Sequence, residues 1–427
     1  MRTCYLFLFV AMLFFRSDEL LAGSSSPADT ISISLSQAEQ LFLKNNFQLL
    51  AANFQVDAAE AAVIQAKLWD NPVVSVDQGA YNPATKKWFD TSKNGETAAS
   101  IQQLILLGGK RNKQISLAKI NSQMTQFRFY DLMRTLKYQL HTSFYALYFL
   151  RESISVYDRE IESLKTMIDA YTIQYKNGNV AFKELARLQS LQFNLGNERL
   201  DVLKEAAEKQ SDLILLTGDT LSRPIRPLLE ASQSNSFHLE NLTYAQLMDS
   251  AMTNRFDLQA AKSQVQFSET NLSLQKSMRV PDVTLGANWD RAGSYIYNYN
   301  SVSLSFPLPL LNLNRGNIKI ARDQVEQSKV QLSSATVQVK TDVENSLSQL
   351  LECDRLYSKA LGQFNGDYEK LVDGITTAYQ KHTISLLEFI DYYETYKNSK
   401  TEFNRLQNNR LAAMEDLNFA TGTVILK

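Results

Sequence analysis

The stretch NFQLLAA at residues 46–52 returns as RFDLQAA at residues 255–261, an offset of 209 residues. Further along, LTG at residues 216–218 returns as ATG at residues 420–422, at an offset of 204 residues. Self-similarity at this range indicates two copies of one structural unit. The duplication therefore predicts that the fold of the first half is repeated in the second.

The N-terminal segment has the layout of a secretory signal. Arg2 precedes an apolar run from Tyr5 to Phe15, and small residues follow it. This run is too short to span a bilayer as a helix. Ser24 stands where a lipoprotein signal requires cysteine, so no lipid anchor is expected. We expect cleavage near residue 24, and a charged patch after the run leaves the position of the cut open.

The composition excludes several classes of protein. A formal net charge of −1 argues against a nucleic-acid partner. Cys4 lies in the predicted signal, so Cys353 has no partner for an intramolecular disulfide. No run of about 18 apolar residues occurs, and a membrane-spanning helix is not expected. Once the secreted chain has crossed one membrane, it could enter another only as a β-barrel.

Two stretches without glycine or proline predict very long helices. Residues 110–177 and 317–361 contain neither residue, and their apolar side chains recur at helical spacing. A helix over the first stretch would be about 100 Å long. Such a length indicates coiled-coil packing. We expect the chain to turn at residues 177–179 and 380–382 and to return through a shorter helix in each half.

Alternation of apolar and polar residues predicts two strands in each half, strictly in the second half and more weakly in the first. Val283, Leu285, Ala287 and Trp289 alternate with small or polar residues, and residues 301–308 repeat the pattern. One apolar and one polar face suit an outer-membrane barrel, although two ordinary hairpins packed on helices would explain the alternation equally well. Four strands cannot close such a barrel, whose smallest type has about eight. Several chains would have to combine, and three would supply twelve strands.

The corner between the last predicted strand and the second long helix carries a family resemblance. FPLPLLNLNRGNI at residues 306–318 closely resembles the TolC family of outer-membrane efflux proteins, and within it the heavy-metal and cation efflux branch. LILLGGK at residues 104–110 is the matching corner of the first half, and the resemblance covers the whole mature chain. It implies a mostly α fold with a transmembrane β part. A trimeric twelve-stranded outer-membrane β-barrel would be continuous with a periplasmic α-helical barrel.

The function implied by the resemblance is passive export. The chain would be the exit duct of a tripartite efflux system, without enzymatic activity or cofactor. It would conduct heavy-metal cations or small toxic compounds to the outside from a periplasmic adaptor and an inner-membrane pump of the resistance-nodulation-division type. Two alternatives remain open. A type I protein-secretion duct shares the fold, whereas a non-pore periplasmic coiled-coil scaffold would lack the barrel.

The repeat and the resemblance together predict the organisation of the chain. The predicted units are a signal peptide at 1–24, a first repeat at 25–218, an equatorial linker at 219–241, a second repeat at 242–422 and a tail at 423–427. Strands are predicted at about 72–80, 97–105, 281–289 and 300–308, long helices at about 110–175 and 316–379, and return helices at about 181–217 and 384–420.

Two carboxylates are the candidates for a channel constriction. Glu388 and Asp391 lie three residues apart, on one face of the second return helix. The resemblance implies that acidic residues at these positions narrow the periplasmic mouth. Six carboxylates around a threefold axis would attract cations and raise one another's pKa values. The alternative is a pair of solvated surface side chains. Tyr379 is a candidate for a gate hydrogen bond, with packing at the turn as its alternative.

The turns are the candidates for partner contact. The resemblance implies that the adaptor meets Asn177 and Gly178 at the first turn, and Lys381 and His382 at the second. His382 is a departure from the family, whose members often have glycine there, because glycine adopts left-handed backbone conformations without strain.

No pattern for a metal site or for catalysis accompanies these features. The three histidines, at positions 141, 238 and 382, have no partner at ligand spacing, so no dedicated zinc site is expected. Residues 108–111 follow a strand and open a helix, but Leu104 and Arg111 break the pattern of a phosphate-binding loop.

Overall fold

The computed structural model describes residues 30–229, 239, 242–292, 296–364, 374–379, 381 and 383–426. The helices are α1 (Leu35–Asn45), α2 (Phe47–Ala66), α3 (Lys110–Lys176), α4 (Phe182–Thr217), α5 (Tyr244–Asn254), α6 (Phe256–Ser277), α7 (Arg315–Phe364) and α9 (Leu386–Thr421). The strands are β1 (Ile31–Ser34), β2 (Val73–Gln78), β3 (Tyr81–Asn82), β4 (Lys87–Trp88), β5 (Thr97–Ile105), β6 (Ile225–Leu228), β7 (Val283–Asp290) and β8 (Tyr299–Ser305).

Some predicted segments reach beyond the described residues. The predicted signal at residues 1–24 lies outside them, as do His238 and His382. The second long helix was predicted over residues 316–379. Residues 315–364 and 374–379 are helical, and the stretch between them is not described. The division into a signal, two repeats, a linker and a tail therefore stays a prediction.

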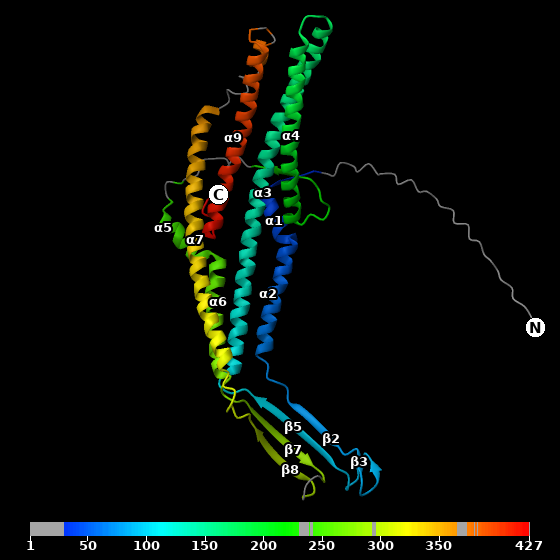
Figure 1. The fold of residues 1–427 in the computed structure, drawn as a ribbon. Helices are drawn as coiled ribbons and strands as arrows, with labels where there is room; N and C mark the ends of the chain where they lie inside the picture. Colours follow the sequence, from blue (N-terminus) through cyan, green and yellow to red (C-terminus); the bar gives the residue numbers. More distant parts are fainter. Residues whose placement is uncertain are drawn as a thin grey trace, which may run out of the picture.

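A rod of helices stands on one end of a small sheet (Figure 1). The shorter helices lie end to end along α3 and α7 in two pairs, α2 with α4 and α6 with α9. At the first junction, Asn46 caps α2 and donates a 2.9 Å hydrogen bond from Nδ2 to the Leu216 carbonyl. At the second, the buried Arg255 pairs with Asp257 and Asp342 at 2.6 and 2.7 Å. Each half thus builds a second, broken rod beside its long helix.

The sheet joins the two halves of the chain. Its order is β2-β5-β7-β8 and every pairing is antiparallel, so one strand pair from each half meets at the β5–β7 boundary. One row across the four strands consists of Val74, Ile101, Ala287 and Val302. The next row, on the opposite face, consists of Ser75, Ser100, Asn288 and Ser301. The sheet has an apolar and a polar face, and Val302 on the apolar face is 85% exposed.

The main core lies at the middle of the rod, around the helix junctions. Phe42 of α1, Phe144 of α3 and Leu417 of α9 are fully buried there, and Ile225 of β6 closes the cluster from outside. β6 pairs in parallel with β1, which adds a two-stranded ribbon to the side of the rod. Among the described residues, no helix has both the length and the apolar character that crossing a membrane requires.

Candidate functional site

The first helical hairpin turns at the end of the rod that is remote from the sheet, and α9 of the second begins at the same end (Figure 1). Asn177 is the C-cap of α3, and Gly178 follows it with a φ of 78°, in open space. This left-handed position suits glycine, which has no Cβ to clash. Lys381 is exposed, and its backbone N–H donates a 3.0 Å hydrogen bond to the Thr377 carbonyl. The first turn therefore lies at the outermost end of its hairpin, and Lys381 is the described residue of the second turn.

A tyrosine pair joins the two hairpin ends. The Tyr171 hydroxyl on α3 is in hydrogen-bond contact with the Tyr379 hydroxyl, and their rings stack with centroids 6.1 Å apart. On its other side, Tyr379 stacks on Phe389 of α9 at 4.7 Å. Tyr379 is only 5% exposed, and burial together with the bond from Tyr171 raises the pKa of Tyr379 above its usual range. Tyr379 thus takes part in both packing and a hydrogen bond.

Glu388 has a structural partner within its own chain. It is the third residue of a capping box, in which Ser385 Oγ accepts from the Glu388 N–H and the Glu388 carboxylate accepts from the Ser385 N–H at 2.8 Å. The backbone and hydroxyl hydrogen bonds from Ser385 lower the pKa of Glu388. This direction is opposite to the one expected for a ring of like charges, because within a single chain the capping bonds dominate.

Asp391 lies in a groove between α4 and α9. The groove has a volume of about 310 Å³ and is lined by Arg187, Ser190, Leu191, Asn194, Leu387, Ile390, Asp391 and Glu394. Arg187 occupies the place in the first repeat that Asp391 occupies in the second, at the offset of 204 residues. Among the described residues, no ion pair joins either of these exposed side chains to a partner. The groove therefore presents free charges of both signs.

Glu160 of α3 is a buried acid, and the periodicity of α3 did not predict its burial. Both carboxylate oxygens of Glu160 are buried and have no hydrogen-bond partner in the described part of the chain. Tyr393 donates a 2.7 Å hydrogen bond to the Glu160 carbonyl, and Lys397 Nζ lies 2.5 Å from Glu198 Oε2. Burial raises the pKa of Glu160 to about 8, although Lys397 and Arg159 oppose the shift. This acid is therefore largely protonated at neutral pH.

His141 is paired in the core at the middle of the rod. Its Nε2 lies 2.6 Å from Glu39 Oε1, and its Nδ1 lies 2.9 Å from Glu415 Oε1 as an ion-pair contact. Burial opposes its charge, but the two carboxylates outweigh that effect and raise the pKa of His141 to about 9. Both ring nitrogens face carboxylates, so the ring offers no lone pair to a metal. No cluster of three possible metal ligands occurs among the described residues.

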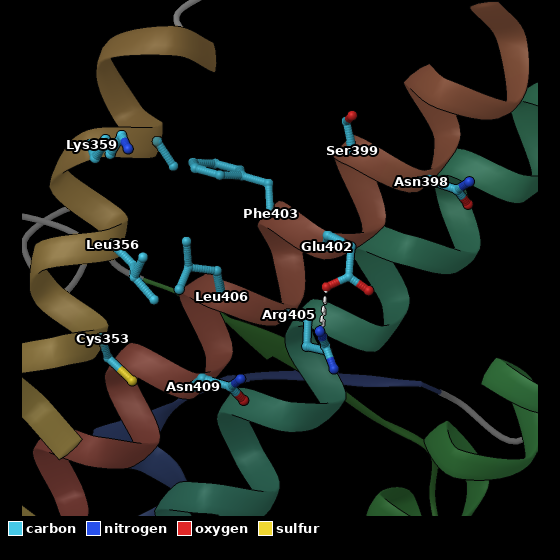
Figure 2. Close-up of a pocket in the computed structure, with 11 residues that line it drawn as sticks. Cys353, Leu356, Lys359, Asn398, Ser399, Glu402, Phe403, Arg405, Leu406 and Asn409 are labelled. Carbon is cyan, nitrogen blue, oxygen red and sulfur yellow. Dashed lines mark hydrogen bonds and ion pairs between the residues drawn. The ribbon is translucent and has the colours of Figure 1, made fainter. Parts of the chain in front are cut away.

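A hollow runs between α7 and α9 in the described structure. Figure 2 shows Leu406 of α9 directed toward Leu356 of α7 and Phe403 directed toward the turn of α7 with Lys359, with the Glu402–Arg405 ion pair on the side of α9 that faces away from α7. The hollow has a volume of about 650 Å³ and is mainly apolar. Burial and the nearby Glu352 raise the pKa of Cys353 at its edge, so the thiol stays protonated. Its walls are those of a helix–helix groove, without convergent polar groups.

Comparison with known proteins assigns the chain to a family. The sequence matches the profile described as Outer membrane efflux protein over residues 39–219 and 247–423. The chain belongs to this family. The two matched segments fall on the two halves of the sequence repeat, and each includes a long helix, its return helix and a strand pair.

Three similar proteins illustrate the family. The cobalt-zinc-cadmium resistance protein CzcC of Cupriavidus metallidurans is 21% identical over 298 residues, which cover 70% of this chain and 68% of CzcC. The CmeC outer membrane channel of Campylobacter jejuni has 14% identity and a TM-score of 0.76 over 91% of this chain and 86% of its own. The open MtrE outer membrane channel of Neisseria gonorrhoeae has 15% identity and a TM-score of 0.72 over 92% and 89%.

These findings confirm the predicted family, fold class and general function. The chain is an outer-membrane efflux channel of the TolC type, located in the outer membrane and extending into the periplasm. Its helical rod is the periplasmic part, so the hairpin ends form the periplasmic extremity. The family assignment favours a channel over the alternative of a coiled-coil scaffold without a pore.

The sequence placed the candidate residues at the hairpin ends but did not reveal their partners. Tyr171 and Arg187 were not expected beside Tyr379 and Asp391, because contacts between the two hairpins span about 200 residues. A signal for His141 did exist. His141 directly follows Leu140 on the apolar stripe of α3, where a polar residue requires a buried partner.

Proposed function

We propose that three copies of this chain assemble into one continuous duct. The observation that supports this proposal is the two-faced sheet with open edges at β2 and β8. Its apolar face suits lipid and its polar face a lumen, but four strands cannot close a barrel. Three chains would supply the twelve strands. Residues 219–229, the described start of the predicted linker 219–241, would belong to a belt around the helical part.

The edges of the helical rod support the same assembly. In the described structure, α2 packs mainly on α3, and α7 packs on α5, α6 and α9, so α2 and α7 form opposite edges. Both edges carry exposed apolar side chains: Phe47, Phe54 and Ile64 on α2, and Ile320, Val330 and Val337 on α7. Contacts between neighbouring copies would bury these side chains and close the helices into a tunnel.

The assembly has a direct test. We expect the protein, extracted from outer membranes in mild detergent, to contain three chains per particle by native mass spectrometry. The same particles should conduct ions across a planar bilayer. A monodisperse monomer without conductance would overturn the proposal, whereas a trimer without conductance would retain the assembly and overturn the duct.

We propose heavy-metal cations as the cargo, received from a resistance-nodulation-division pump through a periplasmic adaptor. Two observations support this choice: the similarity to CzcC, which is described as a cobalt-zinc-cadmium resistance protein, and the acidic pair Glu388 and Asp391. The turns with Asn177, Gly178, Lys381 and His382 would contact the adaptor, while Glu388, Asp391 and Tyr379 would form the constriction. Growth of a gene-deletion strain on cobalt, zinc and cadmium salts tests the cargo. Loss of resistance to dyes or of protein secretion, with unchanged metal resistance, would contradict it.

A further inference from the structure

The loop between β2 and β5 is held in a defined structure by its own internal contacts. It contains the small hairpin of β3 and β4 and lies at the end of the sheet that is remote from the helices (Figure 1). The helices of this channel extend into the periplasm, so this loop lies at the outer face of the outer membrane. The loop belongs neither to the four-stranded sheet nor to the hairpin ends, so neither accounts for its structure.

A buried aspartate organises the loop from inside. The Asp90 carboxylate accepts hydrogen bonds from Asn82 Nδ2 at 3.0 Å, from Thr85 Oγ1 at 2.6 Å and from the Ser92 N–H at 3.0 Å. Hydrogen bonds from Ser92 and Thr85 hold the pKa of Asp90 well below its usual range. Its negative charge is therefore permanent, and it is satisfied by neutral donors inside the loop.

The backbone of the loop is held in one conformation. Lys86 and Phe89 have φ angles of 56° and 49°, a left-handed conformation that is unfavourable for residues with a side chain. Gly95 approaches Asp90 so closely that a Cβ would lie 1.6 Å from its carbonyl oxygen. Arg291, which directly follows β7, donates a 2.7 Å hydrogen bond to the Thr91 carbonyl. Strained positions persist where the surroundings impose them, commonly at functional sites.

This rigid frame displays apolar and cationic side chains to solvent. Trp88 and Phe89 are 71% and 64% exposed, although Trp88 also packs against Tyr81 at 5.2 Å between ring centroids. Lys86, Lys87 and Lys93 are exposed, and none forms an ion pair within the described part of the chain. Glu96, the other carboxylate of the loop, stands at its base beside Gly79. The exposed tip is therefore positive and aromatic.

We propose that this loop binds the phosphorylated headgroups of lipids in the outer leaflet of the outer membrane. The three lysines would contact headgroup phosphates, while Trp88 and Phe89 lie at the boundary with the acyl chains. Aromatic residues favour that boundary, and each basic residue near an anionic surface contributes to binding. The rigid frame reduces the entropy lost when the side chains engage the lipid.

Fluorescence of Trp88 provides the test. Trp69→Phe and Trp289→Phe leave Trp88 as the single tryptophan of the chain. The full protein in mild detergent is titrated with lipid A, which carries phosphate groups, and binding is read from the blue shift of Trp88 emission. The triple change Lys86→Gln, Lys87→Gln and Lys93→Gln should weaken binding by roughly a hundredfold, about fivefold per lysine.

Two sets of controls distinguish lipid binding by the loop from the assembly and conductance of the proposed duct. Lys319→Gln, Lys329→Gln and Lys340→Gln on α7 remove the same charge elsewhere and should leave lipid A binding unchanged. The loop variant should keep wild-type conductance and assembly, which shows that it folds. Equal binding by the loop variant would overturn the proposal, as would an equal blue shift with phosphatidylcholine or inorganic phosphate.

Discussion

The hydroxyls of Tyr171 and Tyr379 meet at the periplasmic end of the channel, and this contact links the first helical hairpin to the second. Tyr379 also stacks on Phe389 of the return helix, so the contact reaches α9. The pair lies beside the groove that contains Arg187 and Asp391, within the same hairpin ends. A movement of the second hairpin away from the first would have to break it.

Tyr379→Phe should therefore favour the open channel. The change keeps the ring and its stacking but removes one hydrogen bond, worth about 1 kcal/mol, which shifts an opening equilibrium about fivefold. Single-channel recording in planar bilayers measures the open probability. Tyr175→Phe is the matched control, because Tyr175 packs on Phe182 near the first turn without a hydroxyl partner among the described residues. Equal open probability in all three proteins would show that the contact does not restrain the tip.

Asp391→Asn should reduce the preference of the channel for cations. Asp391 is exposed and has no ion-pair partner within the described chain, so its charge is available to passing ions. Reversal potentials in a salt gradient measure the effect.

Glu388 has a second role, because Glu388→Gln removes a charge and also weakens the cap of α9. Ser385→Ala weakens that cap by about 1 kcal/mol without changing the charge. If Ser385→Ala alters selectivity as much as Glu388→Gln, the charge of Glu388 is not the cause.

Arg255→Ala should be among the most destabilising substitutions in the rod. Arg255 is 4% exposed, and its removal would leave Asp342 without its ion-pair partner and Asp257 with only a 3.8 Å contact to Arg134. Breaking a fully buried pair costs about 3–5 kcal/mol, and the cost here should be lower because the two aspartates are 36% and 30% exposed. Arg405→Ala, which breaks the exposed pair with Glu402, should cost less than about 1 kcal/mol. Thermal unfolding in detergent compares the two, and similar melting temperatures would contradict the structural role of Arg255.

Gly218→Ala should destabilise the channel much more than Gly178→Ala. Both glycines have left-handed backbones, which cost about 1–2 kcal/mol with a side chain present. A Cβ at Gly218 would also lie 2.4 Å from the Asn45 carbonyl oxygen at the α2–α4 junction, whereas Gly178 is in open space. Melting temperatures of the two variants give the comparison. An equal loss of stability would mean that the junction adapts to the methyl group.

Glu160 should make the stability of the hairpins fall as the pH rises. Its pKa is about 8 in the folded protein, above the ordinary 4.5, so the folded state binds more protons than the unfolded state between these values. Over that window the free energy of unfolding should decrease with pH by up to about 1.4 kcal/mol per unit. Glu160→Gln should flatten the melting temperature between about pH 5 and about pH 8. Glu162→Gln, at an exposed site on the same helix, should leave the slope unchanged. A steep slope in Glu160→Gln would assign the effect to another group.

The long helices and the strand pairs could be predicted because their signals are local. The absence of glycine and proline over residues 110–177 is a property of the chain itself, and so is the alternation over residues 283–289. The residues at the hairpin ends could be located for the same reason, because Gly178 and the segment around Lys381 interrupt helical patterns. Their roles in adaptor contact and in the constriction stay predictions.

The partners of those residues depend on contacts that periodicity does not encode. The carboxylate of Glu388 caps its own helix, Tyr379 finds Tyr171 across 208 residues, and His141 lies between Glu39 and Glu415. The contacts of Tyr379 and His141 require helices from distant parts of the chain to lie side by side, and small rotations of a helix would change which side chains meet. The duplicated pattern determines the elements and their order, whereas tertiary packing alone decides which charges are buried, which are paired and which remain free at the channel end.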